Sequence, residues 1–388
     1  MTASTEPPVS KGAPPQQLDA RWRAQAAEEQ ERSLPSGRTT VSCPSRPGLG
    51  GLGRHLQEVL DALERRGEAG VCICEEPDPD SPPHGALSPT GALARALTGR
   101  LAPFTQLSPA WRMWAASVAF DEQALRRLPP AEHLIAFNGT ALAQLAAARQ
   151  AGYASTSLIA ANSHYRHVLR QHALAQRSHP GIEPPWVTHL LKRNLAEYAQ
   201  ADRIYFSTPY IRESFLEQGY EESRLLRFPL TPAPRYVPPP TRAGSSTFDI
   251  LYIGSLSVHK GVPLLLDAFR RLPGPDMRLK LLGGWGTRGM RRLLQRACAE
   301  DQRISVGPGD PLQALSSARL CVHPAYEDGF AYAPAEALAC GVPVLVSEDT
   351  GMKELIDPGV SGLVLPTGDA GALAEAIEAV HRGEALGG

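Results

Sequence analysis

Residues 326–345 read YEDGFAYAPAEALACGVPVL, and this stretch carries the strongest structural signal in the chain. The short apolar run Leu320-Cys321-Val322 leads into it and predicts a strand, and residues 342–346 predict a second strand. Between these two strands the composition predicts an acidic loop followed by a helix of small residues. Asp328 lies on that loop, and Glu336 lies in the first turns of the helix.

The positions of these two carboxylates indicate a binding site. In an open parallel sheet, ligands bind outside the carboxyl ends of the strands, which is where Asp328 is expected to lie. Two carboxylates at such a place can accept hydrogen bonds from a polyhydroxylated ligand. Taken alone, the same residues also fit a solvated acidic loop, with Glu336 stabilising the positive end of the helix dipole.

The rest of the chain divides into two α/β units separated by a proline-rich segment. Apolar strands alternate with helical periodicity up to residue 228, which is typical of a parallel sheet, and a second such unit starts at Phe248. We predict an α/β fold class with two Rossmann-like domains. The predicted parts are a disordered tail over 1–36, with a short helix near 18–32, a first domain over 37–230, a linker over 231–247 and a second domain over 248–388.

Composition narrows the class of protein. The chain has 388 residues and a formal net charge of −1, which argues against nucleic-acid binding that depends on phosphate neutralisation. The six cysteines are scattered, so we expect buried, reduced thiols in a cytoplasmic protein. No apolar run is long enough to span a membrane. The predicted helix over 111–128 carries two Trp residues, for which we expect core packing, with peripheral contact at the inner membrane face as the alternative.

The glycine pattern Gly48-x-Gly50-x-x-Gly53 offers a rival interpretation. It lies between a predicted strand and a predicted helix, and Glu75 and Glu76 follow the next strand, as in a dinucleotide-binding fingerprint. Ser45-Arg46-Pro47 intervene between the first strand and Gly48, however, whereas the fingerprint glycine normally ends that strand. A glycine-rich loop before a helix also serves other anionic ligands. Nicotinamide binding therefore remains an alternative.

Three predicted loops leave strands at the same end of the second sheet. They cover residues 254–261, 283–286 and 326–336, and Lys260 on the first of them is a point charge suited to a diphosphate. An exposed Lys before a helix is the competing explanation. In the first unit, the strand near 156–161 delivers His164 to its carboxyl end, where a histidine could stabilise developing charge or simply lie at the surface.

The second unit resembles the donor domain of retaining family 4 glycosyltransferases of the GT-B fold. The resemblance rests on three motifs: GSLSxxKG over 254–261, EDGF and EALACGVPV over 327–344, and GMKELI over 351–356. It covers residues 248–381 well. It is weaker over 39–228, where residues 50–53 and the acidic and basic positions between Arg193 and Asp202 also fit.

This resemblance implies two Rossmann-like domains with their parallel sheets facing an interdomain cleft. It implies transfer of a sugar from a nucleotide-diphosphate-sugar to an acceptor hydroxyl, with retention of anomeric configuration and with the leaving phosphate as base. It implies no metal site and no cofactor. The implied partners are the nucleotide-sugar donor and a glycan, lipid-linked or small-molecule acceptor, with no nucleic acid.

The resemblance also implies roles for individual residues. Glu336 would hold the donor ribose, Asp328 stands where the family has Glu near the transferred sugar, and Ser255 stands where it usually has Arg. His164 fits the family's cleft histidine, with His167 as the competing assignment. The catalytic residues implied are His164, Asp328 and Lys260. The donor-binding residues implied are Gly50, Gly51, Gly254, Ser255, Lys260, Gly284, Glu327, Asp328, Gly329, Phe330 and Glu336.

Ser255 and Asp328 keep a further alternative open, namely a glycosyltransferase-like protein that binds a donor without turnover. The nucleotide base, the sugar, the acceptor, the linkage and the oligomeric state are not determined by these motifs.

Overall fold

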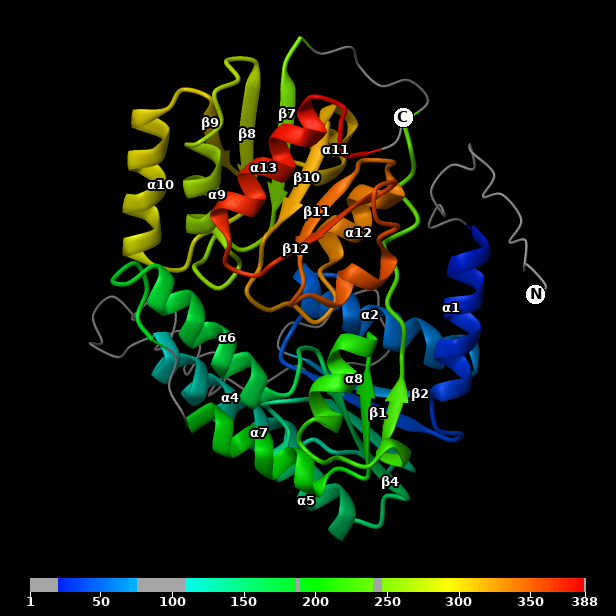
Figure 1. Cartoon of the computed structure of the whole chain (residues 1–388). Helices are drawn as coiled ribbons and strands as arrows, with labels where there is room; N and C mark the ends of the chain where they lie inside the picture. Colours follow the sequence, from blue (N-terminus) through cyan, green and yellow to red (C-terminus); the bar gives the residue numbers. More distant parts are fainter. Residues whose placement is uncertain (1–19, 75–108, 186–188, 240–245, 387–388) are drawn as a thin grey trace, which may run out of the picture.

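The computed structural model describes residues 20–74, 109–185, 189–239 and 246–386. Figure 1 shows two lobes, each built around one sheet. The sheet of the first lobe has the parallel order β2-β1-β3-β4-β5-β6. Its strands are β1 (Thr39–Cys43), β2 (Ala69–Cys74), β3 (His133–Phe137), β4 (Ser155–Ala160), β5 (Arg203–Phe206) and β6 (Leu225–Arg227).

The sheet of the second lobe is also parallel, in the order β12-β11-β10-β7-β8-β9. Its strands are β7 (Phe248–Ile253), β8 (Met277–Leu282), β9 (Ile304–Gly307), β10 (Leu320–His323), β11 (Val344–Ser347) and β12 (Gly362–Leu365). The central strands β7 and β10 consist largely of buried apolar residues, as expected for a parallel sheet covered on both faces. Two parallel sheets with helical connections confirm the predicted α/β class.

Helices connect the strands in both lobes. The first lobe has α1 (Ala20–Ser33), α2 (Gly50–Arg65), α4 (Pro109–Leu125), α5 (Leu142–Gln150), α6 (Tyr165–Ser178), α7 (His189–Gln200), α8 (Pro209–Leu216) and the 3-10 turn η1 (Glu222–Arg224). The second has α9 (Val262–Phe269), α10 (Arg288–Glu300), α11 (Pro311–Ser317), α12 (Tyr332–Ala339), α13 (Ala370–His381) and the 3-10 turn η2 (Gly351–Leu355).

The carboxyl ends of the two sheets face each other. Thr208, which follows β5, donates its hydroxyl to the carbonyl of Gly329 at 2.9 Å, and Gly329 lies in the loop after β10. On the far side of the lobe contact, the Val258 amide after β7 donates to Glu183 at 2.9 Å. The loops that leave both sheets are therefore in direct contact, so residues from the two lobes can share a site.

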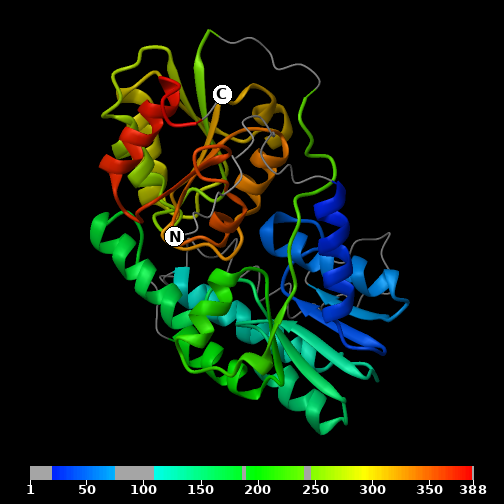
Figure 2. The ribbon, with the colours of Figure 1, turned by 45° about the vertical axis from the view of Figure 1, so that its right-hand side comes forward.

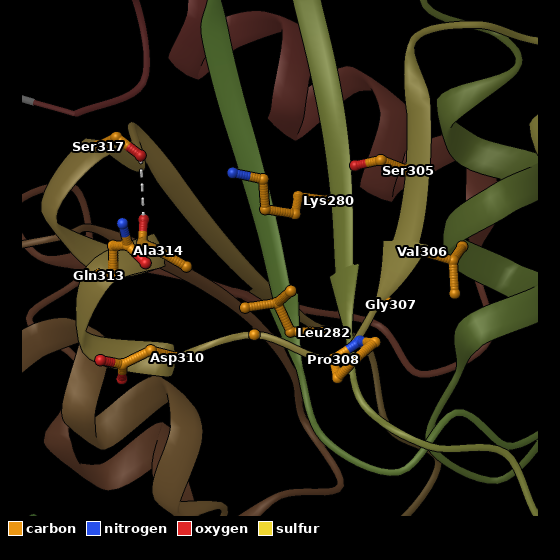
Figure 3. Close-up of a pocket in the computed structure, with 11 residues that line it drawn as sticks. Lys280, Leu282, Ser305, Val306, Gly307, Pro308, Asp310, Gln313, Ala314 and Ser317 are labelled. Atoms are coloured by element: carbon orange, nitrogen blue, oxygen red, sulfur yellow. Dashed lines mark hydrogen bonds between the residues drawn. The ribbon is translucent and has the colours of Figure 1, made fainter.

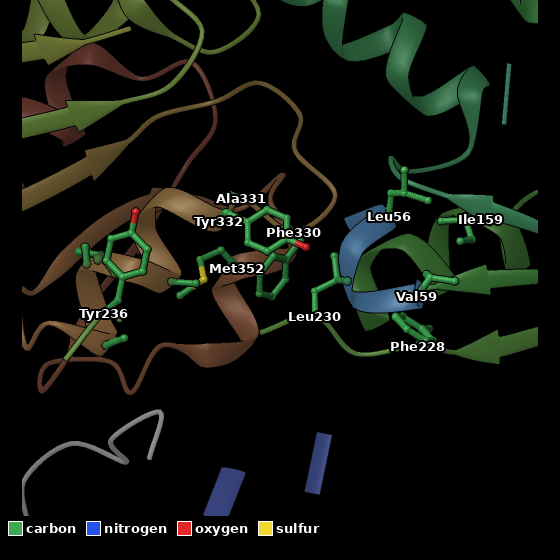
Figure 4. Close-up of a cluster of buried hydrophobic side chains, with 14 of the residues drawn as sticks. Leu56, Val59, Ile159, Phe228, Leu230, Tyr236, Phe330, Ala331, Tyr332 and Met352 are labelled. Atoms are coloured by element: carbon green, nitrogen blue, oxygen red, sulfur yellow. The ribbon is translucent and has the colours of Figure 1, made fainter. Parts of the chain in front are cut away.

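An apolar cluster crosses the lobe contact. Figure 4 shows Leu56 and Val59 of α2, with Phe228 and Leu230 of the connecting segment, close to Phe330, Tyr332 and Met352 of the second lobe. Burial of this kind contributes roughly 25 cal/mol per Å² of apolar surface. Apolar packing therefore supports the closed arrangement in addition to the hydrogen bonds.

The prediction of a disordered tail over 1–36 is wrong for residues 20–36. The helix expected near 18–32 is present as α1, which packs on α2 (Figure 2). Ala26 and Leu34 are buried, and the Gln30 side chain donates to the carbonyl of Pro229 at 2.7 Å. The sequence indicated the helix but not its packing on the first lobe, because much of its attachment is polar and involves partners far away in the sequence.

Other expectations can be compared directly with the described residues. None of the six cysteines, all of which lie in the described residues, forms a disulfide, and five of them are buried. Trp114 packs against the core of the first lobe, as expected, while the side chain of Trp111 and residues Glu75 and Glu76 lie outside the described part of the structure. Within that part, no helix is long and apolar enough to cross a membrane.

Candidate functional site

A cavity of about 300 Å³ lies between the two lobes, at the carboxyl ends of both sheets. The first lobe contributes Gly51, Arg54, His55, Ala161 and Asn162. The second contributes Gly254, Ser255, Lys260, His323, Asp328 and Phe330. The sequence prediction that three separate loops converge on one site thus holds for the loops after β7 and β10.

Lys260 and Asp328 form the polar centre of this interdomain cavity. The Lys260 Nζ lies 2.8 Å from Asp328 Oδ2 and donates to the main-chain carbonyl of Glu327 at 3.0 Å. His323 Nε2 lies 3.0 Å from the same Asp328 oxygen. Burial alone would raise the pKa of Asp328, but Lys260 and His323 outweigh it and hold that pKa well below its ordinary value. Asp328 is therefore an ionised acceptor at neutral pH.

The loop between Asp328 and α12 has an unusual backbone. Ala331 has φ of 61°, and among the described residues it is the one non-glycine residue with positive φ. This left-handed conformation costs an L-residue about 1–2 kcal/mol. It starts α12 and directs Tyr332 toward the first lobe, where the Tyr332 hydroxyl donates to Glu58 at 2.8 Å. Strain of this kind often accompanies functional sites.

Glu336 is buried at the lobe contact, on α12. It forms an ion pair with Arg54 of α2, and the Arg54 guanidinium also lies 4.4 Å from the centre of the Tyr332 ring. Glu336 itself does not line the cavity, but Arg54 and Tyr332 do. The carboxylate predicted to bind ribose thus lies directly behind the cavity wall.

Glu327 binds the first lobe rather than the cavity. Its carboxylate accepts from the Ser163 amide at 3.0 Å, the Ser163 hydroxyl at 2.9 Å and the Asn162 side chain at 3.1 Å. Burial raises its pKa. All three donors belong to the loop after β4, so Glu327 fastens the two lobes together. In this structure Glu327, which the resemblance implies as a donor-binding residue, is thus engaged by the first lobe.

The structure places His164 away from the cavity, and its predicted catalytic role needs correction. The His164 ring packs against Tyr198, Phe215 and Tyr220 in the core of the first lobe. Its Nδ1 accepts from the Arg166 amide at the start of α6, and burial lowers its pKa to about 4. His164 does follow the carboxyl end of β4, as predicted. Its side chain caps α6, however, and points into the core of the first lobe.

The competing histidine, His167, is also absent from the cavity wall. Its Nε2 lies 3.0 Å from the Tyr210 hydroxyl and 3.3 Å from Asp349 of the second lobe. It therefore contributes to the contact between lobes.

Five predicted glycines occupy three kinds of position. Gly51 and Gly254 line the cavity, whereas Gly50 and Gly284 are at the surface, Gly50 with φ of 65°. Gly329 is required by close packing, because a Cβ there would lie 2.4 Å from the carbonyl oxygen of Ala161. Its role in the structure is thus to let the two lobes approach.

Sequence reasoning missed Arg54, His323 and Glu58. Glu58 accepts from Tyr332, from the amide and hydroxyl of Thr231 at 3.0 and 3.1 Å, and from Gln30 at 2.9 Å. Burial raises its pKa to about 7 despite these donors. Nothing in the local pattern marks Arg54 or Glu58, because their partners lie in other elements. His323, at the end of β10, could have been found from its strand-end position.

A second cavity, of about 440 Å³, lies beside the first on the second lobe. Figure 3 shows it between β8, β9 and the start of α11, with Lys280, Leu282, Ser305, Gly307, Asp310 and Gln313 around it. The Gly254 amide donates to the Leu282 carbonyl at 2.9 Å. Gly254 lines the first cavity and Leu282 lines the second, so the neighbouring strands β7 and β8 each carry a residue of one cavity at their carboxyl ends.

Comparison with known proteins identifies relatives of the second lobe. Residues 239–386 match the family described as glycosyl transferases group 1. The chain is 33% identical to the O-antigen chain mannosyltransferase B of Escherichia coli over 135 residues, which are 33% of this chain and 35% of that protein. It is 30% identical to the D-inositol 3-phosphate glycosyltransferase of Xylanimonas cellulosilytica over 139 residues, 34% of this chain and 33% of that protein. The chain thus spans about a third of the length of these relatives.

Solved structures resemble the whole chain. Sucrose-phosphate synthase from Thermosynechococcus elongatus superposes with a TM-score of 0.65 at 20% identity, over 89% of this chain and 90% of that one. An Anabaena protein solved with UDP and glucose gives a TM-score of 0.63 at 17% identity, over 88% and 89%. WaaG, a glycosyltransferase involved in lipopolysaccharide biosynthesis, gives 0.62 at 17% identity, over 88% and 90%. At these identities the likeness concerns the fold.

Proposed function

We propose, on the premise that residues 239–386 belong to the glycosyl transferases group 1 family, that the protein transfers a sugar from a nucleotide-diphosphate-sugar to an acceptor hydroxyl. The chain has the GT-B fold, as predicted from its sequence, with two parallel sheets whose carboxyl ends face each other. The observation that carries the proposal is the interdomain cavity, where Lys260 and Asp328 of the family-matched domain meet residues of the first lobe.

Lys260 is the candidate ligand of the donor diphosphate. It lines the cavity at the carboxyl end of β7, next to Gly254 and Ser255, whose small side chains leave room for a phosphate beside the Lys260 ammonium. A cation at this place would stabilise the negative charge that develops as the nucleoside diphosphate leaves. This role needs no metal ion, so we propose a reaction without a metal or another cofactor.

Asp328 is the candidate contact of the transferred sugar. It stays ionised at neutral pH, so it can accept hydrogen bonds from sugar hydroxyls but cannot serve as a proton donor. Glu336, behind Tyr332, is the candidate ribose contact. We further propose retention of anomeric configuration, with the leaving phosphate accepting the proton of the acceptor hydroxyl, because the described cavity wall offers no other ionised carboxylate for that task.

The second cavity has a place in this proposal. The second cavity is lined by Leu282, whose carbonyl accepts from the amide of Gly254 at the wall of the first cavity. We propose that the sugar and the ribose lie at the first cavity, next to Asp328 and Glu336, and that the base extends to the second cavity. The acceptor would be a glycan, a lipid-linked sugar or a small molecule that approaches from the first lobe.

The test is release of nucleoside diphosphate from a panel of UDP-, GDP- and ADP-sugars, with Glu336→Gln as the site variant. We expect one donor class to release its diphosphate with the wild type and much less with the variant. The control is Glu300→Gln, which removes an exposed carboxylate of α10 far from the cavity. Binding of a donor without release would support the non-catalytic alternative, and stabilisation by NAD alone would favour the oxidoreductase.

A further inference from the structure

Arg54 is the cation that the first lobe places at the interdomain cavity. It lies in the first turns of α2, where its Nε donates to the Gly50 carbonyl at 3.2 Å and a terminal nitrogen pairs with Glu336. The Arg54 side chain is 29% exposed, whereas that of Glu336 is 2% exposed. One side of the guanidinium therefore faces the cavity while the other faces the buried carboxylate.

The charges around the cavity leave a role for a second cation. Of the described residues that line it, Arg54 and Lys260 are the Lys and Arg residues, and Asp328 is the acidic one. Lys260 already lies 2.8 Å from Asp328, so much of its charge is neutralised. A nucleoside diphosphate brings at least two negative charges, which Lys260 alone would not balance. The loop that leaves β7 begins with Gly254 and Ser255, and neither residue carries a charge that could assist Lys260.

The pairing of Glu336 in this structure differs from the pairing that the proposed function requires. In the proposed function its carboxylate accepts from the uncharged ribose hydroxyls, yet in this structure it is paired with Arg54. A guanidinium binds phosphate in the same bidentate manner as carboxylate, and a diphosphate carries more charge than one carboxylate. When the donor binds, Arg54 can therefore pair with the diphosphate, which carries more charge than Glu336. Glu336 can then accept hydrogen bonds from the uncharged ribose hydroxyls.

We propose that Arg54 is a diphosphate ligand contributed by the first lobe, and that it exchanges Glu336 for the diphosphate when the donor binds. The inference rests on the proposed function. Arg54 would connect the two lobes in both states. Without a donor it pairs with Glu336 of the second lobe, and with a donor it binds the diphosphate. Gly50 and Gly51 place no side chain between Arg54 and the cavity, which leaves room for this movement.

The test compares the affinities of two ligands that share a base. Calorimetric titrations would measure UDP against uridine, GDP against guanosine and ADP against adenosine, with the wild type and with Arg54→Gln and Arg54→Lys. Arg54→Gln should weaken binding of the diphosphate about tenfold or more, since hydrogen bonds to charged groups are worth ~1.5–3 kcal/mol. Nucleoside binding should stay constant or tighten, because Glu336 is freed. Arg54→Lys should fall between.

The matched control is Arg65→Gln, the same substitution on the exposed face of the same helix. It should leave both affinities unchanged. Equal weakening of nucleoside and diphosphate by Arg54→Gln would overturn the proposal, because Arg54 would then act only through the shape of the site. Unchanged diphosphate binding would overturn it as well, while leaving the proposed function intact. If the wild type binds none of the three diphosphates, the proposed function and this inference both fail.

Discussion

At the scale of single residues, Lys260 combines two tasks, because it neutralises Asp328 and faces the cavity. Lys260→Ala should lower the turnover number about 10²–10³-fold, the loss typical when one group that stabilises developing negative charge is removed. Steady-state kinetics with the active donor would measure it. The control, Lys192→Ala, removes an exposed lysine of α7 and should change neither the turnover number nor the melting temperature.

A contradictory result would be a Lys260→Ala enzyme with near-normal turnover. The same substitution should also raise the pKa of Asp328, since Lys260 is the largest of the causes that lower it.

At the scale of elements, the start of α12 is held by one strained residue. Ala331→Gly should leave the free energy of unfolding unchanged or raise it slightly, because glycine adopts positive φ without the steric cost. Ala337→Gly, in the same helix at a buried right-handed position, should lower it by about 1 kcal/mol or more. Urea unfolding of the two variants tests this. Equal losses would mean that Ala331 carries no strain.

The secondary-structure elements also show which features could be predicted from the sequence. Strands and helices of the second lobe could be predicted because apolar periodicity and small-residue loops are local features, and Lys260 and Asp328 followed from their positions after strands. The packing of α1 on α2 and the side-chain direction of His164 could not, since both depend on contacts with other elements. The Arg54–Glu336 pair joins residues 282 positions apart, so only the closed arrangement of lobes reveals it.

At the scale of the whole molecule, Glu58 links α1, the connecting segment and α12. Its pKa is raised to about 7 from 4.5, mainly by burial, so the folded protein binds this proton more tightly than the unfolded chain. The free energy of unfolding should therefore fall as pH rises from about 4.5 to about 7. Each pKa unit corresponds to about 1.4 kcal/mol, so this group should account for about 3 kcal/mol.

Glu58→Gln removes this titration while keeping the shape of the side chain. The unfolding free energy of the wild type minus that of the variant should fall by about 3 kcal/mol as pH rises across that range, and urea titrations at several pH values would measure it. Glu197 and Glu354, whose pKa values burial also raises to about 7, are unchanged in both proteins and cancel. A difference independent of pH would contradict the account of Glu58.

The central claim concerns the whole molecule, namely that the contact between the lobes forms a binding site for a nucleotide-sugar donor. The most direct measurement is calorimetric titration of UDP, GDP, ADP and NAD into the wild type and into Lys260→Ala. We predict that one nucleoside diphosphate binds the wild type and that Lys260→Ala weakens it about tenfold or more. Binding of NAD alone, or a diphosphate affinity that Lys260→Ala leaves unchanged, would contradict the claim.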